Sequence, residues 1–513
     1  MPIFFLTTNI LMSLTLFARA YGGTSTDYAD YPNAIVQTTD GGFAIAGYTR
    51  SFGQSDGNFF VLKLDPNGAL QWAKGFGGAT LKNERAYSVI QTTDGGYVIV
   101  GRTQSYGAGL DDFLVLKINS DGSNIVWAKT FGGPGTDYGY SVVQTTDGYA
   151  VAGSTLSFGA GGYDFLVLKL DSDGGLVWAK TFGGTGDDAA WCVIQATDGG
   201  LVVAGYTGSF GAGSQDFLVL KLDSDGGLDW AKTFGGAGGD FAYSITQTAD
   251  GGYFVGGFTG SFGVGVPDFL VVKLDSDGGL EWTKAFGGEN WDYAYSVTQT
   301  ADEGYVIAGS TLSFGIGQYD CLLVKMAKDG AFQWARTFGG AANDEAHSVT
   351  RTTDGGCVVA GYTANFGAVG PDILVLRLDS EGNYADCVLE CSPLTTVPAL
   401  EISSPIVGAD CSPAVNIPTM QILAINPTVI EACEPVYEDV GEVGSGSHAG
   451  ITCLSLAGGL LLISPDVMDI RLYSADGRLA YFGKLEKGQN RIPLDQGVYI
   501  WSVENYKGKA VVR

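Results

Sequence analysis

Apolar and polar residues alternate along most of the chain in short runs that are separated by turn residues. A representative stretch has four such runs, at residues 140–144, 149–154, 165–170 and 176–182, rich in β-branched and aromatic side chains. Turn sequences between them, such as Thr146-Asp147-Gly148 and Asp173-Gly174-Gly175, supply the positive φ angles that tight hairpins need. The pattern predicts four short antiparallel strands in this stretch.

The same unit recurs seven times along the chain. A Gln-Thr-(Thr/Ala)-Asp anchor, or a close variant, begins each copy at Gln37, Gln91, Gln144, Gln195, Gln247, Gln299 and Arg351, and a tryptophan closes six of them at Trp72, Trp127, Trp178, Trp230, Trp282 and Trp334. Seven units of four strands lie within the usual blade count of a propeller. We therefore predict an all-β chain with a seven-bladed β-propeller of four-stranded blades over residues 19–387.

The two ends of the repeat array are complementary. The seventh copy has Asp386 where the others have tryptophan, so its fourth strand is missing. Residues 16–23 align with residues 333–340, which places Phe17 at the position of Trp334. We expect the N-terminal segment to supply the outer strand of the last blade and thereby remove the open edges of the ring.

Composition limits the partners. The 513 residues carry a formal net charge of −27, which disfavours nucleic acid and anionic lipid as ligands. Only two histidines, His347 and His448, are available for zinc or for acid–base chemistry. We expect no cofactor. The recurrent Asp-x-Asp-Gly hairpins leave calcium as an alternative, although the further ligands and the distal Glu of an EF-hand are absent.

The segments outside the repeats differ in character. Residues 3–17 are mainly apolar and precede Ala18-Arg19-Ala20, which predicts a signal peptide over 1–18, atypical because no basic residue comes before the apolar run. Residues 388–450 contain no Lys or Arg and seven of the fifteen prolines, which predicts a β-prone linker or stalk. Residues 451–513 alternate again and predict a separate C-terminal module of short strands. No stretch approaches the ~20 apolar residues of a transmembrane span.

Two parts of the chain resemble known families. The hairpin at Asp171-Ser172-Asp173-Gly174 with Trp178 resembles the Asp-box of sialidase-type propellers and is similar to the tryptophan-docking strand of quinoprotein propellers. Both resemblances imply a fold and no activity. The C-terminal residues 470–473, 476–478, 497–500 and 509–513 are similar to the type A sorting domain of the type IX secretion system. This resemblance implies that residues 451–513 form a small C-terminal β-sandwich, and it implies export through that machinery to the cell surface or the medium.

One acidic residue stands seven positions before each anchor: Asp30, Glu84, Asp137, Asp188, Asp240, Asp292 and Asp344. By symmetry these carboxylates form a ring on the face that carries the loop leading into each blade, where they could bind a cation or a hydroxylated ligand. The alternative is that each carboxylate caps its own loop. Three positions after most of these acids stands an aromatic residue or His347, which we expect to pack.

The clearest departure from the repeat is Trp291 in one of the leading loops. An exposed aromatic residue suits stacking against a sugar or peptide, so Trp291 is the first candidate for ligand contact. Arginines are few in the blades, so a clamp of several arginines is not expected. The chain is predicted to be a secreted or surface-displayed, non-catalytic module that binds an extracellular protein or glycan. The alternatives are a polysaccharide hydrolase or lyase that uses the acidic ring, and a purely structural surface protein.

Overall fold

The computed structural model is all-β, and no helix occurs among the residues that it describes. It describes residues 16–383 apart from 24, 30, 32–33, 52–56, 78–81, 264–266, 316 and 366–369, and beyond residue 388 only the backbone of the strands given below. The chain divides into two compact units, Met1–Cys433 and Glu434–Arg513. Within the described part, no helix has the length and apolar character needed to cross a membrane.

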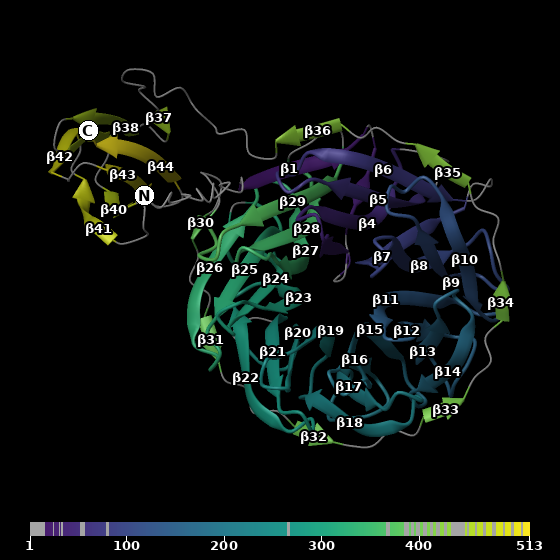
Figure 1. The fold of residues 1–513 in the computed structure, drawn as a ribbon. Coiled ribbons are helices and arrows are strands. Elements are labelled where there is room, and N and C mark those ends of the chain that lie inside the picture. Colours follow the sequence, from purple (N-terminus) through teal and green to yellow (C-terminus); the bar gives the residue numbers. More distant parts are fainter. Residues whose placement is uncertain are drawn as a thin grey trace, which may run out of the picture. The chain divides into compact units, whose positions relative to one another are not determined.

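Seven antiparallel sheets surround a central axis, and the first strand of each lies innermost (Figure 1). Blade 1 comprises the split inner strand β2 (Asp27–Tyr28) and β3 (Ile35–Gln37), β4 (Phe43–Thr49), β5 (Asn58–Leu64) and β6 (Leu70–Gly77). Blade 2 comprises β7 (Glu84–Gln91), β8 (Tyr97–Thr103), β9 (Asp112–Ile118) and β10 (Ile125–Gly132). Blade 3 comprises β11 (Asp137–Thr145), β12 (Gly148–Thr155), β13 (Asp164–Asp171) and β14 (Leu176–Phe182).

The remaining blades repeat this order. Blade 4 comprises β15 (Asp188–Gln195), β16 (Leu201–Thr207), β17 (Asp216–Leu222) and β18 (Leu228–Gly235); blade 5 comprises β19 (Asp240–Gln247), β20 (Tyr253–Thr259), β21 (Asp268–Leu274) and β22 (Leu280–Gly287). Blade 6 comprises β23 (Asp292–Gln299), β24 (Tyr305–Thr311), β25 (Asp320–Met326) and β26 (Phe332–Phe338). Blade 7 comprises β27 (Asp344–Arg351), β28 (Cys357–Thr363), β29 (Asp372–Leu378) and the N-terminal β1 (Phe17–Gly22). The predicted seven-bladed propeller is confirmed.

The N-terminal strand closes the ring as expected. β1 pairs with β29 from Phe17 opposite Arg377 to Tyr21 opposite Ile373. Phe17 also takes over the tryptophan's packing role, because it lies against Gly68 of blade 1 just as Trp334 lies against Gly382. Both glycines have positive φ and no room for a Cβ atom. The anchor of blade 1 adds a second link, since the backbone N–H of Thr353 donates to Gln37 Oε1 at 2.9 Å.

The hydrophobic core lies between neighbouring blades. Strands two and three of most blades are buried on both faces, and seven clusters of buried side chains fill the seven blade-to-blade boundaries. Between blades 2 and 3, for example, Val98 and Phe113 pack with Val151 and Leu166. Each fully buried side chain of this size contributes about 1.5–3 kcal/mol. The core therefore depends on a closed ring, since each blade is covered by its neighbours.

Seven short strands add a fifth strand to every blade at the rim (Figure 1). They pair in turn with the outermost strands of blades 6, 5, 4, 3, 2, 1 and 7: β30 (Leu389–Glu390), β31 (Leu394–Thr396), β32 (Glu401–Ser403), β33 (Gly408–Asp410), β34 (Ala414–Asn416), β35 (Gln421–Ala424) and β36 (Thr428–Glu431). Each strand is followed in the sequence by one of the seven prolines from Pro393 to Pro435. The segment expected to be a linker thus pairs with the propeller in backbone register.

The C-terminal unit contains two four-stranded sheets. One has the order β37 (Ser447–His448), β38 (Ile451–Leu456), β39 (Gly459–Ser464) and β42 (Gly488–Pro493). The other has the order β41 (Leu479–Leu485), β40 (Met468–Ser474), β43 (Gly497–Val503) and β44 (Tyr506–Val512). β44 contacts β38 and β39 of the first sheet, so the two sheets pack as a small sandwich.

Candidate functional site

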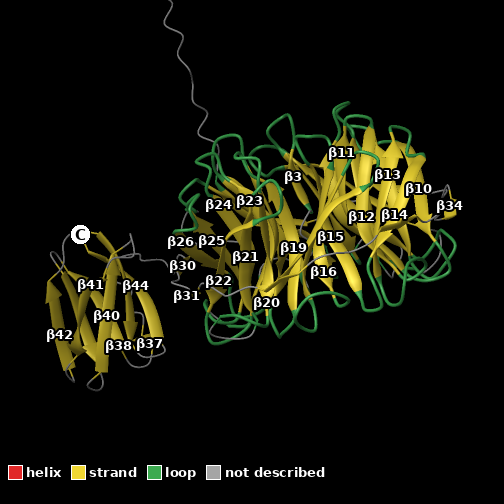
Figure 2. Cartoon of the chain, turned by 90° about the horizontal axis from the view of Figure 1, so that it is seen from below, coloured by secondary structure: helices red, strands yellow, loops and turns green. Residues whose placement is uncertain are grey.

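The propeller strands run between two layers of loops (Figure 2). We call the side that carries the loops leading into each blade the loop face, and the side with the anchor hairpins the hairpin face. Each predicted acidic residue of blades 2–7 is the first residue of its innermost strand, at the loop face. The predicted ring of acids is therefore present as a set of equivalent positions.

The carboxylates of this ring hold their own loops. In blades 3–6 the Oδ2 atom of Asp137, Asp188, Asp240 or Asp292 accepts a bond from a glycine N–H four residues earlier at 2.8–2.9 Å and from a serine hydroxyl at 2.6–2.8 Å. Asp344 accepts from Gly340 N–H at 2.9 Å, and Glu84 accepts from the Thr103 hydroxyl at 3.3 Å. All six acids are 0–1 % exposed. The geometry favours the alternative in which each acid caps its loop.

Blade 1 departs from the expected position. Asp30 lies outside the described residues, and Asp27 takes the structural place of the ring acid, since it pairs with Thr49 as Asp137 pairs with Thr155. Asp27 Oδ2 accepts from Gly23 N–H at 2.9 Å and from the Ser51 hydroxyl at 2.6 Å. The inner strand of this blade is split by extra residues, so counting back from the anchor reaches the wrong aspartate. Among the described residues, no cluster of three or more acidic, Cys or His side chains could hold a metal.

Aromatic side chains surround the propeller axis. In blades 2–7 they are the third residue after the ring acid, and in blade 1 Tyr31 of the loop joins them. We call this set the axial ring: Tyr31, Tyr87, Tyr140, Trp191, Tyr243, Tyr295 and His347. In blades 2–7 the register of the innermost strand shifts at this residue. A β-bulge re-aims a side chain, and here it turns one aromatic residue per blade toward the axis.

The axial ring is a continuous set of ring contacts. Neighbouring centroids are 3.8 Å apart for Tyr31 and Tyr87, 4.1 Å for Tyr140 and Trp191, and 4.2 Å for Tyr295 and His347. Burial raises the pKa values of Tyr87, Tyr140 and Tyr295 well above the ordinary value, so these phenols are neutral at physiological pH. The axial ring packs the axis, as expected, and forms the floor of the loop face.

The tier above the axial ring varies from blade to blade. It consists of the residue after each ring acid and its partner across the sheet: Tyr28 with Tyr48, Arg85 with Arg102, Tyr138 with Ser154, Ala189 with Tyr206, Phe241 with Phe258, Tyr293 with Ser310, and Glu345 with Tyr362. We call these seven pairs the variable tier. Six different pairs occur, because only blades 3 and 6 share one, a tyrosine with a serine. The residues on either side of the pairs repeat closely.

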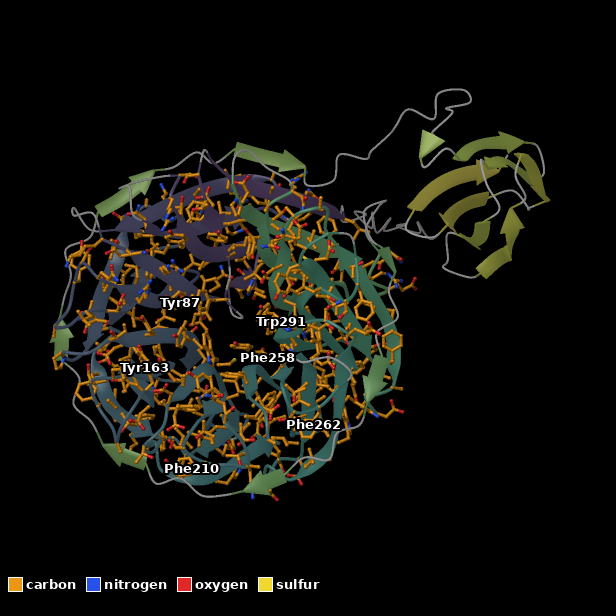
Figure 3. All side chains as sticks on the ribbon, turned by 180° about the vertical axis from the view of Figure 1, so that it is seen from behind. Tyr87, Tyr163, Phe210, Phe258, Phe262 and Trp291 are labelled. Atoms are coloured by element: carbon orange, nitrogen blue, oxygen red, sulfur yellow. The ribbon has the colours of Figure 1, made fainter. Side chains whose placement is uncertain are left out.

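Blades 5 and 6 contribute an aromatic wall to this tier. Phe258 lies 4.8 Å from Phe241 and 4.9 Å from Tyr293 between ring centroids. Tyr293 contacts Tyr319 at 6.1 Å and Trp291 at 6.3 Å. Trp291 is 51 % exposed, and Figure 3 shows it with Phe258 toward the inner side of the ring. The first candidate for ligand contact is therefore the exposed end of a continuous aromatic surface.

Blade 7 places a buried acid in the same tier. Glu345 accepts a bond from the Tyr362 hydroxyl at 2.6 Å, lies 3.1 Å from His347 Nε2, and is 3.5 Å from the Tyr295 hydroxyl. Burial opposes its charge, but the hydrogen bonds from His347 and Tyr362 outweigh burial and lower the pKa of Glu345. This network links the variable tier to the axial ring. It fixes the Glu345 side chain by hydrogen bonds and keeps its carboxylate ionised.

The hairpin face has a different chemistry, because one ion pair recurs in every blade. A buried lysine of strand three, or Arg377 in blade 7, pairs at 2.5–3.2 Å with the anchor aspartate: Lys63–Asp40, Lys117–Asp94, Lys169–Asp147, Lys221–Asp198, Lys273–Asp250, Lys325–Asp302 and Arg377–Asp354. A shallow open depression on this face, between blades 5 and 6, is lined by Asp250, Lys273 and Glu281. Lys273 pairs with both acids, and Lys328, which also lines the depression, pairs with Glu303 at 2.5 Å. Both lysines of its lining are therefore paired.

Comparisons with known proteins agree with the fold. Residues 196–229, in blade 4, match the family described as a domain of unknown function (DUF5122) beta-propeller. Regulatory protein FlaEY of Caulobacter vibrioides is 25 % identical over 363 residues, covering 62 % of this chain and 36 % of that protein, so the chain spans about a third of its length.

Two solved structures are similar over most of the chain. One is the extracellular domain of the hybrid two component system BT4673 from B. thetaiotaomicron, at 10 % identity and a TM-score of 0.27, covering 93 % of this chain and 80 % of that one. The other is PorZ, a surface component of the type-IX secretion system of Porphyromonas gingivalis, at 11 % identity and a TM-score of 0.31, covering 96 % and 75 %.

Proposed function

We propose that the propeller is a non-catalytic module that binds an extracellular glycan or protein on its loop face. The observation that carries this proposal is the variable tier, where seven equivalent positions hold six different pairs of side chains. Positions that serve packing repeat from blade to blade, as the ring acids and the Lys–Asp pairs do. Recognition of an asymmetric ligand requires side chains that differ around the axis.

The aromatic wall supports binding through ring contacts. Aromatic side chains provide large, rigid surfaces for sugar rings or peptide side chains at a low cost in conformational entropy. Trp291 is half exposed and is backed by Tyr293, which holds it in place through an edge contact. The ring acids, in contrast, are almost fully buried and bonded to their own loops, which argues against their use as the paired carboxylates of a polysaccharide hydrolase.

We also propose that the chain is exported and reaches the medium or the cell surface. The support is the apolar segment at 3–17 and the similarity of the C-terminal residues to a type IX sorting domain. Under this proposal residues 1–18 are removed, so Phe17 is lost and residues 19–22 remain as a shorter closing strand that pairs with β29 and β36. The secretion machinery is the partner of the C-terminal unit. Mass spectrometry of both termini of the protein recovered from the culture medium or cell surface tests it; recovery from the cytoplasm alone, with residues 1–18 intact, contradicts it.

Array screening tests the binding proposal. The full-length protein is applied to arrays of glycans and matrix proteins together with the variants Trp291→Ala and Phe332→Ala. Phe332 is a matched control because it is an exposed aromatic residue (41 %) on the outermost strand β26 of blade 6. We expect binding to be lost with Trp291→Ala and kept with Phe332→Ala. Blank arrays with folded protein, or equal effects of both variants, contradict the proposal.

A further inference from the structure

Three arginines gather on the loop face of blades 1 and 2, against the expectation from the sequence. Arg50 and Arg85 both lie over the Tyr48 ring, with guanidinium carbons 5.6 and 4.5 Å from its centroid. Arg102 lies over the Tyr138 ring at 5.3 Å. Their sequence positions are scattered over three different strand ends. Arg85 and Arg102 belong to the variable tier, and the fold places Arg50 beside it, over Tyr48.

Across the described ranges, the charges of this arginine cluster are balanced only in part. Arg102 pairs with Asp111 at 2.8 Å. Among the described residues, neither Arg50 nor Arg85 has an acidic side chain within ion-pair distance. This is unusual in a chain whose net charge is −27, with 55 acidic residues against 28 Lys and Arg.

The arrangement has an energetic cost. Arg85 and Arg102 are directly opposite each other in the β7–β8 pair, and like charges at directly opposed positions of an antiparallel pair are destabilising. The corresponding pairs of the other six blades contain neither Lys nor Arg. The repulsion between Arg85 and Arg102 occurs in one blade of seven and does not help packing. It therefore points to a role in binding.

The side-chain chemistry specifies the ligand group. A guanidinium stacked on an aromatic ring keeps its in-plane N–H groups available, and these match the two oxygens of a carboxylate or sulfate in a bidentate contact. Within the part of the chain that the structure describes, the guanidinium groups of Arg50 and Arg85 therefore have no acidic partner. The third guanidinium group, on Arg102, is oriented by Asp111. Around the axis, the aromatic wall of blades 5 and 6 offers faces for uncharged rings.

We propose that the arginine cluster of blades 1 and 2 binds the anionic group of an acidic glycan, a carboxylate or a sulfate, whose sugar rings contact the aromatic wall. This inference rests on the proposed binding function and narrows its ligand from any glycan or protein to an acidic carbohydrate. Nucleic acid is disfavoured because three arginines cannot offset the repulsion between a polyphosphate and a strongly acidic protein.

The test measures binding of the full-length protein to polygalacturonate, to dextran sulfate and to neutral dextran. Arg85→Gln and Arg50→Gln are compared with Arg351→Gln, which removes the same charge from an exposed position at the end of β27 on the hairpin face. We expect at least one acidic polymer to bind about tenfold or more tightly than dextran. Its affinity should fall about tenfold in Arg85→Gln, and it should also fall with added salt. Arg351→Gln should change it less than about twofold.

A second readout separates binding from folding. Because Arg85 faces Arg102, Arg85→Gln should leave the melting temperature unchanged or raise it. Loss of affinity together with a lowered melting temperature in Arg85→Gln, and no loss in Arg50→Gln, would overturn the inference.

The outcomes also separate the two proposals. Equal binding of dextran and both acidic polymers, lost in Trp291→Ala but not in Arg85→Gln, overturns the acidic-glycan inference and leaves the binding function standing. No binding of any array member overturns both. Preference for polygalacturonate identifies carboxylate as the recognised group, and preference for dextran sulfate identifies sulfate; either result supports the inference.

Discussion

The two faces of the propeller differ in how closely their side chains repeat from blade to blade. On the hairpin face, a buried cation pairs with the anchor aspartate in all seven blades, lysine in six of them and Arg377 in the seventh. On the loop face, the variable tier holds two tyrosines in one blade, two arginines in the next and two phenylalanines in another. Both faces are built from the same strands, so the difference cannot come from the fold.

The comparison shows how to separate packing from recognition in a repeat protein. A side chain that serves its own blade is needed seven times and repeats. A side chain that serves one ligand is needed once and breaks the repeat. By this criterion the ring acids, which repeat and are buried, belong with the hairpin-face pairs, and Trp291, Arg85 and Glu345 belong to the site.

The largest expected effect comes from comparing two tryptophans. Trp178 packs on Gly226 of the next blade, so Trp178→Ala should lower the free energy of unfolding by about 3 kcal/mol through the cavity it leaves. Trp291→Ala should leave stability within about 0.5 kcal/mol because the residue is exposed. Chemical denaturation of both variants checks this. Equal destabilisation by the two variants would contradict the distinction between residues that repeat for packing and residues that break the repeat for recognition.

The next effect concerns the repeated ion pair. Asp198→Ala leaves the buried Lys221 ammonium without its partner and should cost about 2 kcal/mol of folding stability. The equivalent change Asp147→Ala in blade 3 should cost a similar amount, and Asp173→Ala, at an exposed hairpin position, should cost little. Ligand affinity should not change in any of them. A loss of affinity in Asp198→Ala with unchanged stability would place recognition on the hairpin face.

The two faces should also respond differently to pH. At the loop face, burial raises the pKa values of Asp112, Asp164 and Asp344 from 3.8 to about 6. The folded chain then holds protons that the unfolded chain has released, so stability falls as pH rises from about 4 to 6. At the hairpin face, hydrogen bonding to Lys117 lowers the pKa of Asp94 to about 2, and its contribution is lost only as pH falls below about 4.

We therefore expect a higher melting temperature at pH 5 than at pH 7.5. Calorimetry of the wild type and of Asp112→Asn checks this, because the variant should show a weaker pH dependence and a higher melting temperature at pH 7.5. Blade 1 already has Asn58 at the equivalent position. A melting temperature that rises between pH 5 and 7.5 would contradict the raised pKa values of these buried aspartates.

The smallest effect is local and concerns the rim. Val415 of β34 is opposite Phe131 of β10, and Val415→Pro removes a backbone donor from this short strand. Hydrogen exchange of residues 130–132 should become about tenfold faster, while residues 180–182 of β14, paired with β33, should not change. Fast exchange at both places in the wild type would show that the rim strands are not paired in solution.

Much of the fold could be predicted because it rests on short-range patterns repeated seven times. Blade number followed from two ladders of residues, and the role of Phe17 followed from its alignment with Trp334. The rim strands could not be predicted in the same way, because each one pairs with a strand that is distant in sequence, and they meet the blades in reverse order. Their seven prolines were visible in the sequence, but no local signal indicates which strand they face.

The site was predicted in part. Trp291 was found because it breaks the repeat and is exposed, whereas Asp27 was missed because extra residues shift the count in blade 1. The arginine cluster was missed for a physical reason: Arg50, Arg85 and Arg102 lie on three strand ends, and only cross-strand register and blade packing bring them onto Tyr48 and Tyr138. A comparison of equivalent positions across blades finds it, once register is known.

Tryptophan oxidation footprinting with and without saturating ligand tests the central claim most directly, that recognition belongs to the face where the blades differ. Six tryptophans, from Trp72 to Trp334, occupy the same repeat position in blades 1–6, and Trp291 alone stands in a leading loop. We predict that ligand protects Trp291 and leaves those six unchanged. Protection of the six repeated tryptophans with Trp291 unaffected would contradict the account.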